Sequence, residues 1–348
     1  MNPLALSTLV LSLVLGTMMT LMSHHWLLAW MGLEVNTLAI MPLMAKHNHP
    51  RAVEATTKYF LIQAAASSMV LFSSMTNAWF TGEWNITELS NQVSMITMSV
   101  AISMKLGLAP LHFWLPEVMQ GLNLTTGLIL TTWQKLAPIA LLYQIAPNMN
   151  MPILMMLGLL STLMGGWGAL NQTQLRKIMA YSSTAHLGWM VMIISLMPEL
   201  TILNLMIYLS LTTAMFTTLK FMASTKINTL ATSWTKSPTL TSMSLLTLMS
   251  LAGLPPLTGF MPKWLILQEL TKQNMPMIAT MMALSALLSL FFYMRLTYVM
   301  TLTISPNTSN YSLTWRYLTL QPKTVTALMT TLSTMLLPMT PTLIILLS

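Results

Sequence analysis

One apolar segment of the chain reads Lys105-Leu-Gly-Leu-Ala-Pro-Leu-His-Phe-Trp-Leu-Pro-Glu117. It places a lysine, a glycine and two prolines in a run that is otherwise mostly hydrophobic. A second segment, Leu251-Ala-Gly-Leu-Pro-Pro-Leu-Thr-Gly-Phe-Met-Pro-Lys263, has the same character. Proline removes a backbone donor and clashes with the preceding turn, and glycine tolerates the left-handed backbone found at helix ends. Both segments are therefore predicted to be helices that break part-way along their length.

The composition places these segments in a membrane protein. The 348 residues are 55% hydrophobic and 6% charged, with a mean hydropathy of +0.68. Soluble domains carry about 25% charged residues, so the composition excludes a cytosolic enzyme, a secreted domain and a disordered protein. The apolar runs are continuous rather than alternating, which favours membrane-spanning helices over a β-barrel. The predicted fold class is an all-α polytopic membrane protein.

The apolar runs predict eleven transmembrane helices. They cover residues 3–22, 25–45, 56–80, 93–120, 124–146, 150–170, 178–197, 199–222, 239–270, 275–301 and 323–346. The first ten form two five-helix units, and the fourth helix of each unit is a broken one, at about 93–120 and 239–270. Because five is odd, consecutive units insert with opposite orientations.

The predicted domain organisation follows from this pattern. It is a first repeat over 1–146, a second, inverted repeat over 147–301, and a loop with a C-terminal transmembrane helix over 302–348. Broken helices at corresponding places in inverted halves are typical of a transport site. The alternative interpretation is that both breaks are ordinary proline kinks.

Charged residues in the loops predict an orientation. If the N-terminus faces a side called A, the basic residues on that side are Lys46, Arg51, Lys58, Arg176, Lys177, Lys220, Lys226, Lys236, Arg295, Arg316 and Lys323. The opposite side holds Glu83, Glu88, Glu199, Glu269 and Lys272. By the positive-inside rule, side A is the cytoplasm or the mitochondrial matrix. This asymmetry explains the net charge of +8 without a nucleic-acid partner.

Four ionisable residues remain at membrane depth, namely Glu34, Lys105, Lys135 and Lys263. Each costs about 2.5–3.5 kcal/mol at the centre of a helix, and such a cost usually marks function. Burial disfavours a charged lysine and a nearby carboxylate favours it, so buried lysines joined by water can pass protons. Glu34 is the expected partner of Lys105 or Lys135. A structural Glu–Lys ion pair is the alternative, but it leaves two lysines unexplained.

Two histidines are weaker candidates for the same relay. His112 follows the first break and His186 lies in the seventh predicted span. Histidine titrates near neutral pH, although a histidine inside a membrane is as often a hydrogen-bonded packing residue. The chain has no cysteine, which excludes thiolate metal sites and iron–sulfur ligation. Its histidines lack metal-ligand spacing, so we expect neither a metal site nor a cofactor site.

The two broken segments and Tyr181-Ser-Ser-Thr-Ala-His-Leu-Gly188 together are similar to the signature of a known family. The chain resembles the antiporter-like membrane subunits of respiratory complex I, the proton-pumping NADH:ubiquinone oxidoreductase, over essentially its whole length. Its 37 methionines and its lack of cysteine are similar to the composition of members encoded by animal mitochondrial DNA.

This resemblance implies a function, a location and site residues. The chain is expected to translocate protons across the mitochondrial inner membrane, with its N-terminus in the matrix and its C-terminus in the intermembrane space. In the family, a glutamate faces a lysine on the first broken helix and two further lysines continue a hydrated line. Those positions fall on Glu34, Lys105, Lys135 and Lys263.

The resemblance also implies where the cofactors and partners are. The NADH, FMN, iron–sulfur and ubiquinone sites are expected on other subunits. The expected partners are neighbouring antiporter-like subunits, other membrane-arm subunits and membrane lipids. Two other functions stay open at this point: a subunit of a multi-protein cation/proton antiporter, and a scaffold of the membrane arm that does not pump.

Overall fold

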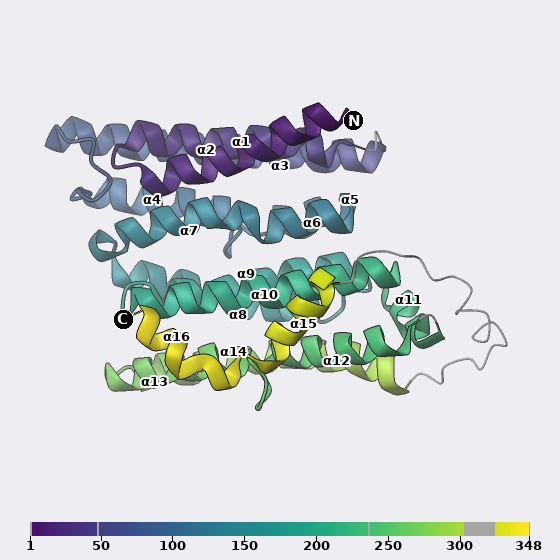
Figure 1. Cartoon of the computed structure of the whole chain (residues 1–348). Helices are drawn as coiled ribbons and strands as arrows, with labels where there is room; N and C mark the ends of the chain where they lie inside the picture. Colours follow the sequence, from purple (N-terminus) through teal and green to yellow (C-terminus); the bar gives the residue numbers. More distant parts are fainter. Residues whose placement is uncertain (1, 47–48, 236, 303–323, 348) are drawn as a thin grey trace. The chain divides into compact units, whose positions relative to one another are not determined.

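In the computed structural model, the secondary-structure elements of the described residues are α-helices and short 3-10 helices (Figure 1). It describes residues 2–46, 49–235, 237–302 and 324–347. Within them, six helices are long and apolar enough to cross a membrane. These are α1 (Pro3–Met22), α2 (Trp26–Met44), α3 (Pro50–Thr81), α8 (Met151–Ala169), α10 (Pro198–Met222) and α14 (Pro276–Leu302). The predicted class, an all-helical membrane protein, is confirmed.

The other expected spans coincide with shorter or more polar helices. The first broken segment consists of α4 (Gln92–Leu106) and α5 (Trp114–Gly121), and the second of α12 (Pro238–Ala252) and α13 (Phe260–Lys272). The helix α9 (Leu175–Ile193) is long enough to cross a membrane, but its first turn contains two basic residues, Arg176 and Lys177. At the C-terminal end, a 3-10 turn that contains a proline separates α15 (Thr324–Met335) from α16 (Thr340–Leu347). Lys236, Arg316, Lys323 and most of the loop expected before the last span lie outside the described residues.

One interruption was not indicated by the sequence pattern. The expected span over 124–146 is divided into α6 (Leu124–Thr131) and α7 (Trp133–Ile145). The Thr132 hydroxyl donates to the Leu128 carbonyl over 2.7 Å, a local bond that competes with regular helix. Further on, Pro138 offers no N–H to the Gln134 carbonyl. The division falls immediately before the turn of helix that carries Lys135.

The chain forms two compact units, which are described separately. The first comprises Met1–Ser161 and Val191–Pro198, and the second Thr162–Met190 and Glu199–Ser348. In the first unit, α1 packs along α2, and α3 contacts α2, α4 and α5. In the second unit, α12 packs against α14 and α15, while α13 packs against α14 and the short α11 (Ile227–Ala231) also contacts α14. Each unit therefore packs one broken helix against its own neighbours.

Candidate functional site

Lys105 lies in the last turn of α4, where the first broken helix ends. The helix stops at Gly107, whose φ of 75° is the left-handed conformation that glycine adopts without strain. The lysine side chain is buried, with 6% of its surface exposed. Its Nζ atom has no hydrogen-bond partner among the residues that the structure describes. The negative end of the α4 dipole favours a cation at this position.

Side chains from two other helices fix the broken ends of this segment. The Gln63 amide of α3 donates to the Lys105 carbonyl over 3.4 Å, and the Trp114 indole of α5 donates to the Met104 carbonyl over 3.1 Å. Carbonyls at a helix end have no partner within the helix, so these bonds satisfy them. The turn between the two halves contains a cis Ala109–Pro110 bond and the buried His112, whose ring is tilted by 32° against that of Phe113 with centroids 4.4 Å apart.

Lys135 lies in the first turn of α7, directly after the division at Thr132, and is 3% exposed. Lys105 and Lys135 line one small cavity in the first unit. The volume of the cavity in which the centre of a water molecule can lie is about 20 Å³. Its other polar walls come from α2, α3 and α7, and they are Asn36, Thr37, Tyr59, Gln63 and Gln134. The structure therefore brings two of the four predicted lysine and glutamate residues to one polar cavity.

Glu34 is the fourth residue of the predicted relay. It lies on α2 and is half-buried, but it is not among the residues that line the cavity. The Lys105 Nζ has no hydrogen-bond partner within the described residues, so it makes no direct bond to Glu34, and the alternative pairing of Glu34 with Lys135 stays a prediction. The Thr37 hydroxyl lies 2.9 Å from the Glu34 backbone carbonyl and 3.1 Å from Glu34 Oε2, so its one proton is shared between them, and Thr37 lines the cavity.

Lys263 belongs to the second unit, where it lies on α13 after the second break. Its Nζ donates to the carbonyl of Ala252 over 2.8 Å, so the lysine reaches back across the break to the end of α12. Gly253 ends α12 with a φ of 81°, and a Cβ atom there would lie 2.9 Å from the Lys263 Nζ. The break thus gives Lys263 a carbonyl acceptor and leaves no room for a side chain beside it.

His186 also lies in the second unit, on α9. It is buried, and its ring lies against Tyr208 of α10 with centroids 5.6 Å apart. The structure places neither His186 nor Lys263 in the cavity that holds Lys105 and Lys135. The six predicted site residues therefore fall into two groups, one in each unit.

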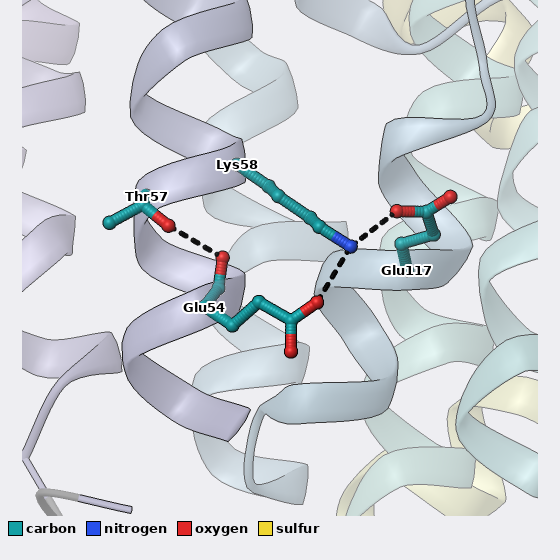
Figure 2. Close-up of polar contacts among 4 residues, drawn as sticks. All are labelled: Glu54, Thr57, Lys58 and Glu117. Carbon is teal, nitrogen blue, oxygen red and sulfur yellow. Dashed lines mark hydrogen bonds and ion pairs between the residues drawn. The ribbon is translucent and has the colours of Figure 1, made fainter. Parts of the chain in front are cut away.

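A cluster of three charges that joins α3 to α5 was not predicted from the sequence. Figure 2 shows Lys58 between two carboxylates. Its Nζ lies 2.8 Å from Glu54 on the same helix and 2.9 Å from Glu117 on α5. Glu117 closes the sequence motif that contains the first break, but its partner lies 59 positions away in the chain. No local pattern in the sequence indicates such a pair.

The amide side chains that line the cavity were also missed. Asn36, Gln63 and Gln134 lie in predicted spans, where amide side chains are far less frequent than serine and threonine in this chain. The presence of amides in the spans could have been noted from the sequence. It would not have indicated which of them line the same cavity as the lysines. Across residues 2–46, 49–235, 237–302 and 324–347, histidine and acidic residues do not gather in threes as a metal site would need.

Comparisons with known proteins identify the family. Residues 23–289 match the family model described as "NADH:quinone oxidoreductase/Mrp antiporter, TM", and residues 290–344 match "NADH dehydrogenase subunit 2 C-terminus". The NADH-ubiquinone oxidoreductase chain 2 of Xenopus laevis is 64% identical over 98% of this chain and 99% of its own length. The corresponding protein of Carassius auratus is 62% identical, with 98% of each chain covered.

A solved structure agrees with these matches. A chain of respiratory complex I from Thermus thermophilus, determined with bound Aureothin, superimposes with a TM-score of 0.82 and 25% identity. The match covers 97% of this chain and 80% of the Thermus chain. The resemblance to antiporter-like subunits of complex I is confirmed, and the chain belongs to the NADH-ubiquinone oxidoreductase chain 2 family.

Proposed function

We propose that this chain is an antiporter-like membrane-arm subunit of NADH:ubiquinone oxidoreductase that moves protons from the mitochondrial matrix to the intermembrane space. Protons pass along Lys105, Lys135 and Lys263, and Glu34 controls the first step. His112 and His186 are accessory groups beside the two broken helices. The chain is a multi-pass protein of the inner membrane, with its N-terminus in the matrix and its C-terminus in the intermembrane space.

The observation that carries this proposal is the shared cavity of Lys105 and Lys135. Both lysines are almost completely buried in a helical membrane protein, yet they open onto one polar space. A buried ammonium is costly, and a lysine can exist there in either protonation state, depending on neighbouring charges. Two lysines facing one cavity are suited to exchanging a proton.

The proposed topology has eleven spans, arranged as two inverted five-helix repeats over 1–146 and 147–301 with a further helix at the C-terminal end. The similar construction of the two breaks supports it. In each, the first half-helix ends on a glycine with positive φ, at Gly107 and Gly253. In each, an X-Pro sequence follows and a second half-helix begins within the next turn or two. Two unrelated proline kinks would not need matching left-handed glycines.

We propose that Glu34 couples the lysine relay to quinone chemistry on other subunits. Quinone reduction on other subunits shifts charge along the membrane arm and changes the charge or orientation of the Glu34 carboxylate. That change reaches the cavity through the Thr37 hydroxyl and through space, and it alters how firmly Lys105 holds its proton. Lys105 then passes a proton to Lys135, and onward transfer involves Lys263. The redox cofactors and the quinone stay on other subunits, and the neighbouring contacts are with membrane-arm subunits and lipid.

The test is the substitution Lys135→Met in complex I purified and reconstituted into proteoliposomes. We expect NADH-driven acidification of the lumen per electron to fall, because methionine keeps the length of the side chain but cannot carry a proton. The matched control is Lys46→Met, which removes an exposed lysine in a loop and should leave the proton-to-electron ratio unchanged.

Two results would contradict the proposal. An unchanged proton-to-electron ratio in Lys135→Met would make the chain a scaffold that does not pump. A purified complex that exchanged sodium for protons without oxidising NADH would indicate a cation/proton antiporter.

A further inference from the structure

Thr258 is a buried residue in the turn between α12 and α13, and the proposed relay does not use it. Its side chain is 1% exposed, whereas Pro255 and Pro256 of the same turn are exposed. Its hydroxyl donates to the backbone carbonyl of Ser333, which lies 75 positions later, in the last turn of α15. A buried hydrogen bond therefore joins the second break to the C-terminal region of the chain.

The end of α15 makes this carbonyl available. The last four carbonyls of a helix have no N–H to accept from within the helix, and α15 ends at Met335, two residues after Ser333. A 3-10 turn that contains Pro338 follows, so α15 does not continue as a regular helix. A buried carbonyl without a donor is costly, and the Thr258 hydroxyl supplies the donor.

Hydroxyl side chains on the buried side of α15 bond within their own helix. Thr330 and Ser333 are buried, and their hydroxyls donate to backbone carbonyls of α15 itself. The outward side of α15 is apolar, with Val325, Leu328 and Met335 each more than half exposed. The helix packs along α12, but these two hydroxyls do not reach across to the break. The backbone carbonyl that accepts from Thr258 does.

The neighbouring residue in the turn is held by close packing against α12. Gly259 has no room for a Cβ atom, because the backbone carbonyl of Ser250 lies there. The helix α13 begins directly after Gly259, and Lys263 lies in its first turn, with its Nζ 2.8 Å from the Ala252 carbonyl. Contacts to α12 at Gly259 and to α15 at Thr258 therefore set where the lysine side chain begins.

We propose that Thr258 is a positioning residue for Lys263. By donating to the Ser333 carbonyl, it fixes the start of α13 so that the Lys263 Nζ reaches the carbonyl of Ala252. The helix α15 lies in the region that matches the NADH dehydrogenase subunit 2 C-terminus, and it thereby becomes part of the second break. This inference rests on the proposed function, because the position of Lys263 matters for transport only if Lys263 carries protons.

The test compares Thr258→Val with Thr258→Ser in purified complex I reconstituted into proteoliposomes. Valine keeps the shape of threonine without the hydroxyl, whereas serine keeps the hydroxyl and loses a methyl group. We expect Thr258→Val to lower coupled turnover per assembled complex about fivefold, which corresponds to about 1 kcal/mol in the barrier. Thr258→Ser should retain most of the turnover. A role in packing alone predicts the opposite ranking, because serine leaves a cavity that valine fills.

Ser333→Ala and Thr330→Val are the matched controls on α15. Ser333→Ala keeps the backbone carbonyl that accepts from Thr258. Thr330→Val removes a buried hydroxyl that donates to its own helix over 3.0 Å. We expect nearly normal turnover per assembled complex in both. A loss in either control as large as that in Thr258→Val would show that the packing of α15, rather than the bond to Thr258, is responsible.

The variants Lys263→Met and Lys135→Met separate this inference from the proposed function. Normal turnover in Thr258→Val, with both lysine variants impaired, would overturn the role of Thr258 and leave the proposed function intact. Impaired Thr258→Val beside normal Lys263→Met would also overturn it, because Thr258 would then act on something other than Lys263. Normal turnover and pumping in both lysine variants would overturn the proposed function and this inference with it.

A high-resolution structure of the unmodified complex gives a test that needs no variant. Two contacts are expected together, the Thr258 hydroxyl on the Ser333 carbonyl and the Lys263 Nζ on the Ala252 carbonyl. Either contact missing from that structure would contradict the proposal.

Discussion

Lys105 and Lys135 are buried and Lys263 is half-buried, and their local environments differ although all three lie in predicted spans. Lys263 has a backbone carbonyl 2.8 Å from its Nζ, whereas the Lys105 Nζ has no hydrogen-bond partner within the described part of the chain. A carbonyl accepts from both the charged and the neutral amine, so it orients Lys263 without fixing its protonation state. Lys105 depends instead on the helix dipole, on Glu34 and on the contents of the cavity.

The substitution Gly253→Ala tests whether the orientation of Lys263 matters. Alanine in a left-handed conformation costs about 1–2 kcal/mol, and its Cβ would lie 2.9 Å from the Lys263 Nζ. The end of the lysine must move away and lose its bond to the Ala252 carbonyl. We expect lower thermal stability of the complex and a several-fold loss of coupled turnover, measured on purified complex I.

The matched control for this prediction is Gly82→Ala. Gly82 ends α3 with a φ of 77°, and nothing lies within 4 Å of a Cβ placed there. It therefore carries the same backbone strain without touching a lysine. We expect a similar loss of stability and normal turnover. Equal turnover losses in the two variants would show that strain, rather than the position of Lys263, is responsible.

Two kinds of contact hold the second half of the first broken helix against α3. One is the ion pair between Lys58 and Glu117 (Figure 2). The other is close packing at Gly121, where an added Cβ would lie 2.5 Å from the carbonyl oxygen of Arg51 and 2.7 Å from the Cβ of Ala55. Exposed ion pairs contribute little to stability, and these three charged side chains are 42–62% exposed. Packing against the backbone cannot be relieved by moving a flexible side chain.

We therefore predict that Gly121→Ala disturbs the complex more than Glu117→Gln does. Gly121→Ala should push α5 away from α3, lower the thermal stability of the complex and reduce its turnover. Glu117→Gln keeps the size of the side chain, and exposed ion pairs contribute little to stability. We therefore expect nearly unchanged thermal stability and a turnover within about twofold of normal. Thermal unfolding and quinone reductase activity measure both effects. The opposite ranking would mean that the charge cluster, rather than the close packing, fixes α5.

The distribution of charge over the whole chain predicts how it lies in the membrane. Basic residues that the structure describes, such as Lys46, Arg51 and Lys226, belong to the side predicted to face the matrix. Glu83 belongs to the opposite side. This asymmetry is a property of the complete set of spans, because one span more or fewer would exchange the sides of every loop that follows.

The absence of cysteine from the chain allows a direct test of this orientation. Lys226 and Glu83 are both exposed, so Lys226→Cys and Glu83→Cys place a reactive thiol on each predicted side. A maleimide that does not cross membranes should label Glu83→Cys in mitochondria stripped of their outer membrane. It should label Lys226→Cys only in inverted inner-membrane vesicles. Labelling of both positions from one side would contradict the proposed span count.

Particular residues show how far sequence reasoning reaches. It placed Lys105 and Lys263 beside helix breaks, because glycine and proline act on the backbone next to them. It did not indicate the division at Thr132, because threonine hydroxyls bond back to carbonyls in many helices without interrupting them. It expected Glu34 to pair with Lys105 or Lys135, and it did not indicate that the Lys105 Nζ makes no hydrogen bond within the described residues. Direct pairing depends on distances between helices, and a local sequence pattern carries no information about those distances.

The sequence by itself determined the membrane class, the helical fold, the two breaks and the buried lysines. Each of these follows from local quantities: hydropathy along the chain, backbone preferences of glycine and proline, and the cost of a charge in hydrocarbon. Only the tertiary structure decided that Lys105 and Lys135 share a cavity, that Asn36 is buried beside them, and that Lys58 joins α3 to α5. Those relations join residues far apart in the chain, so they exist only once the helices have packed.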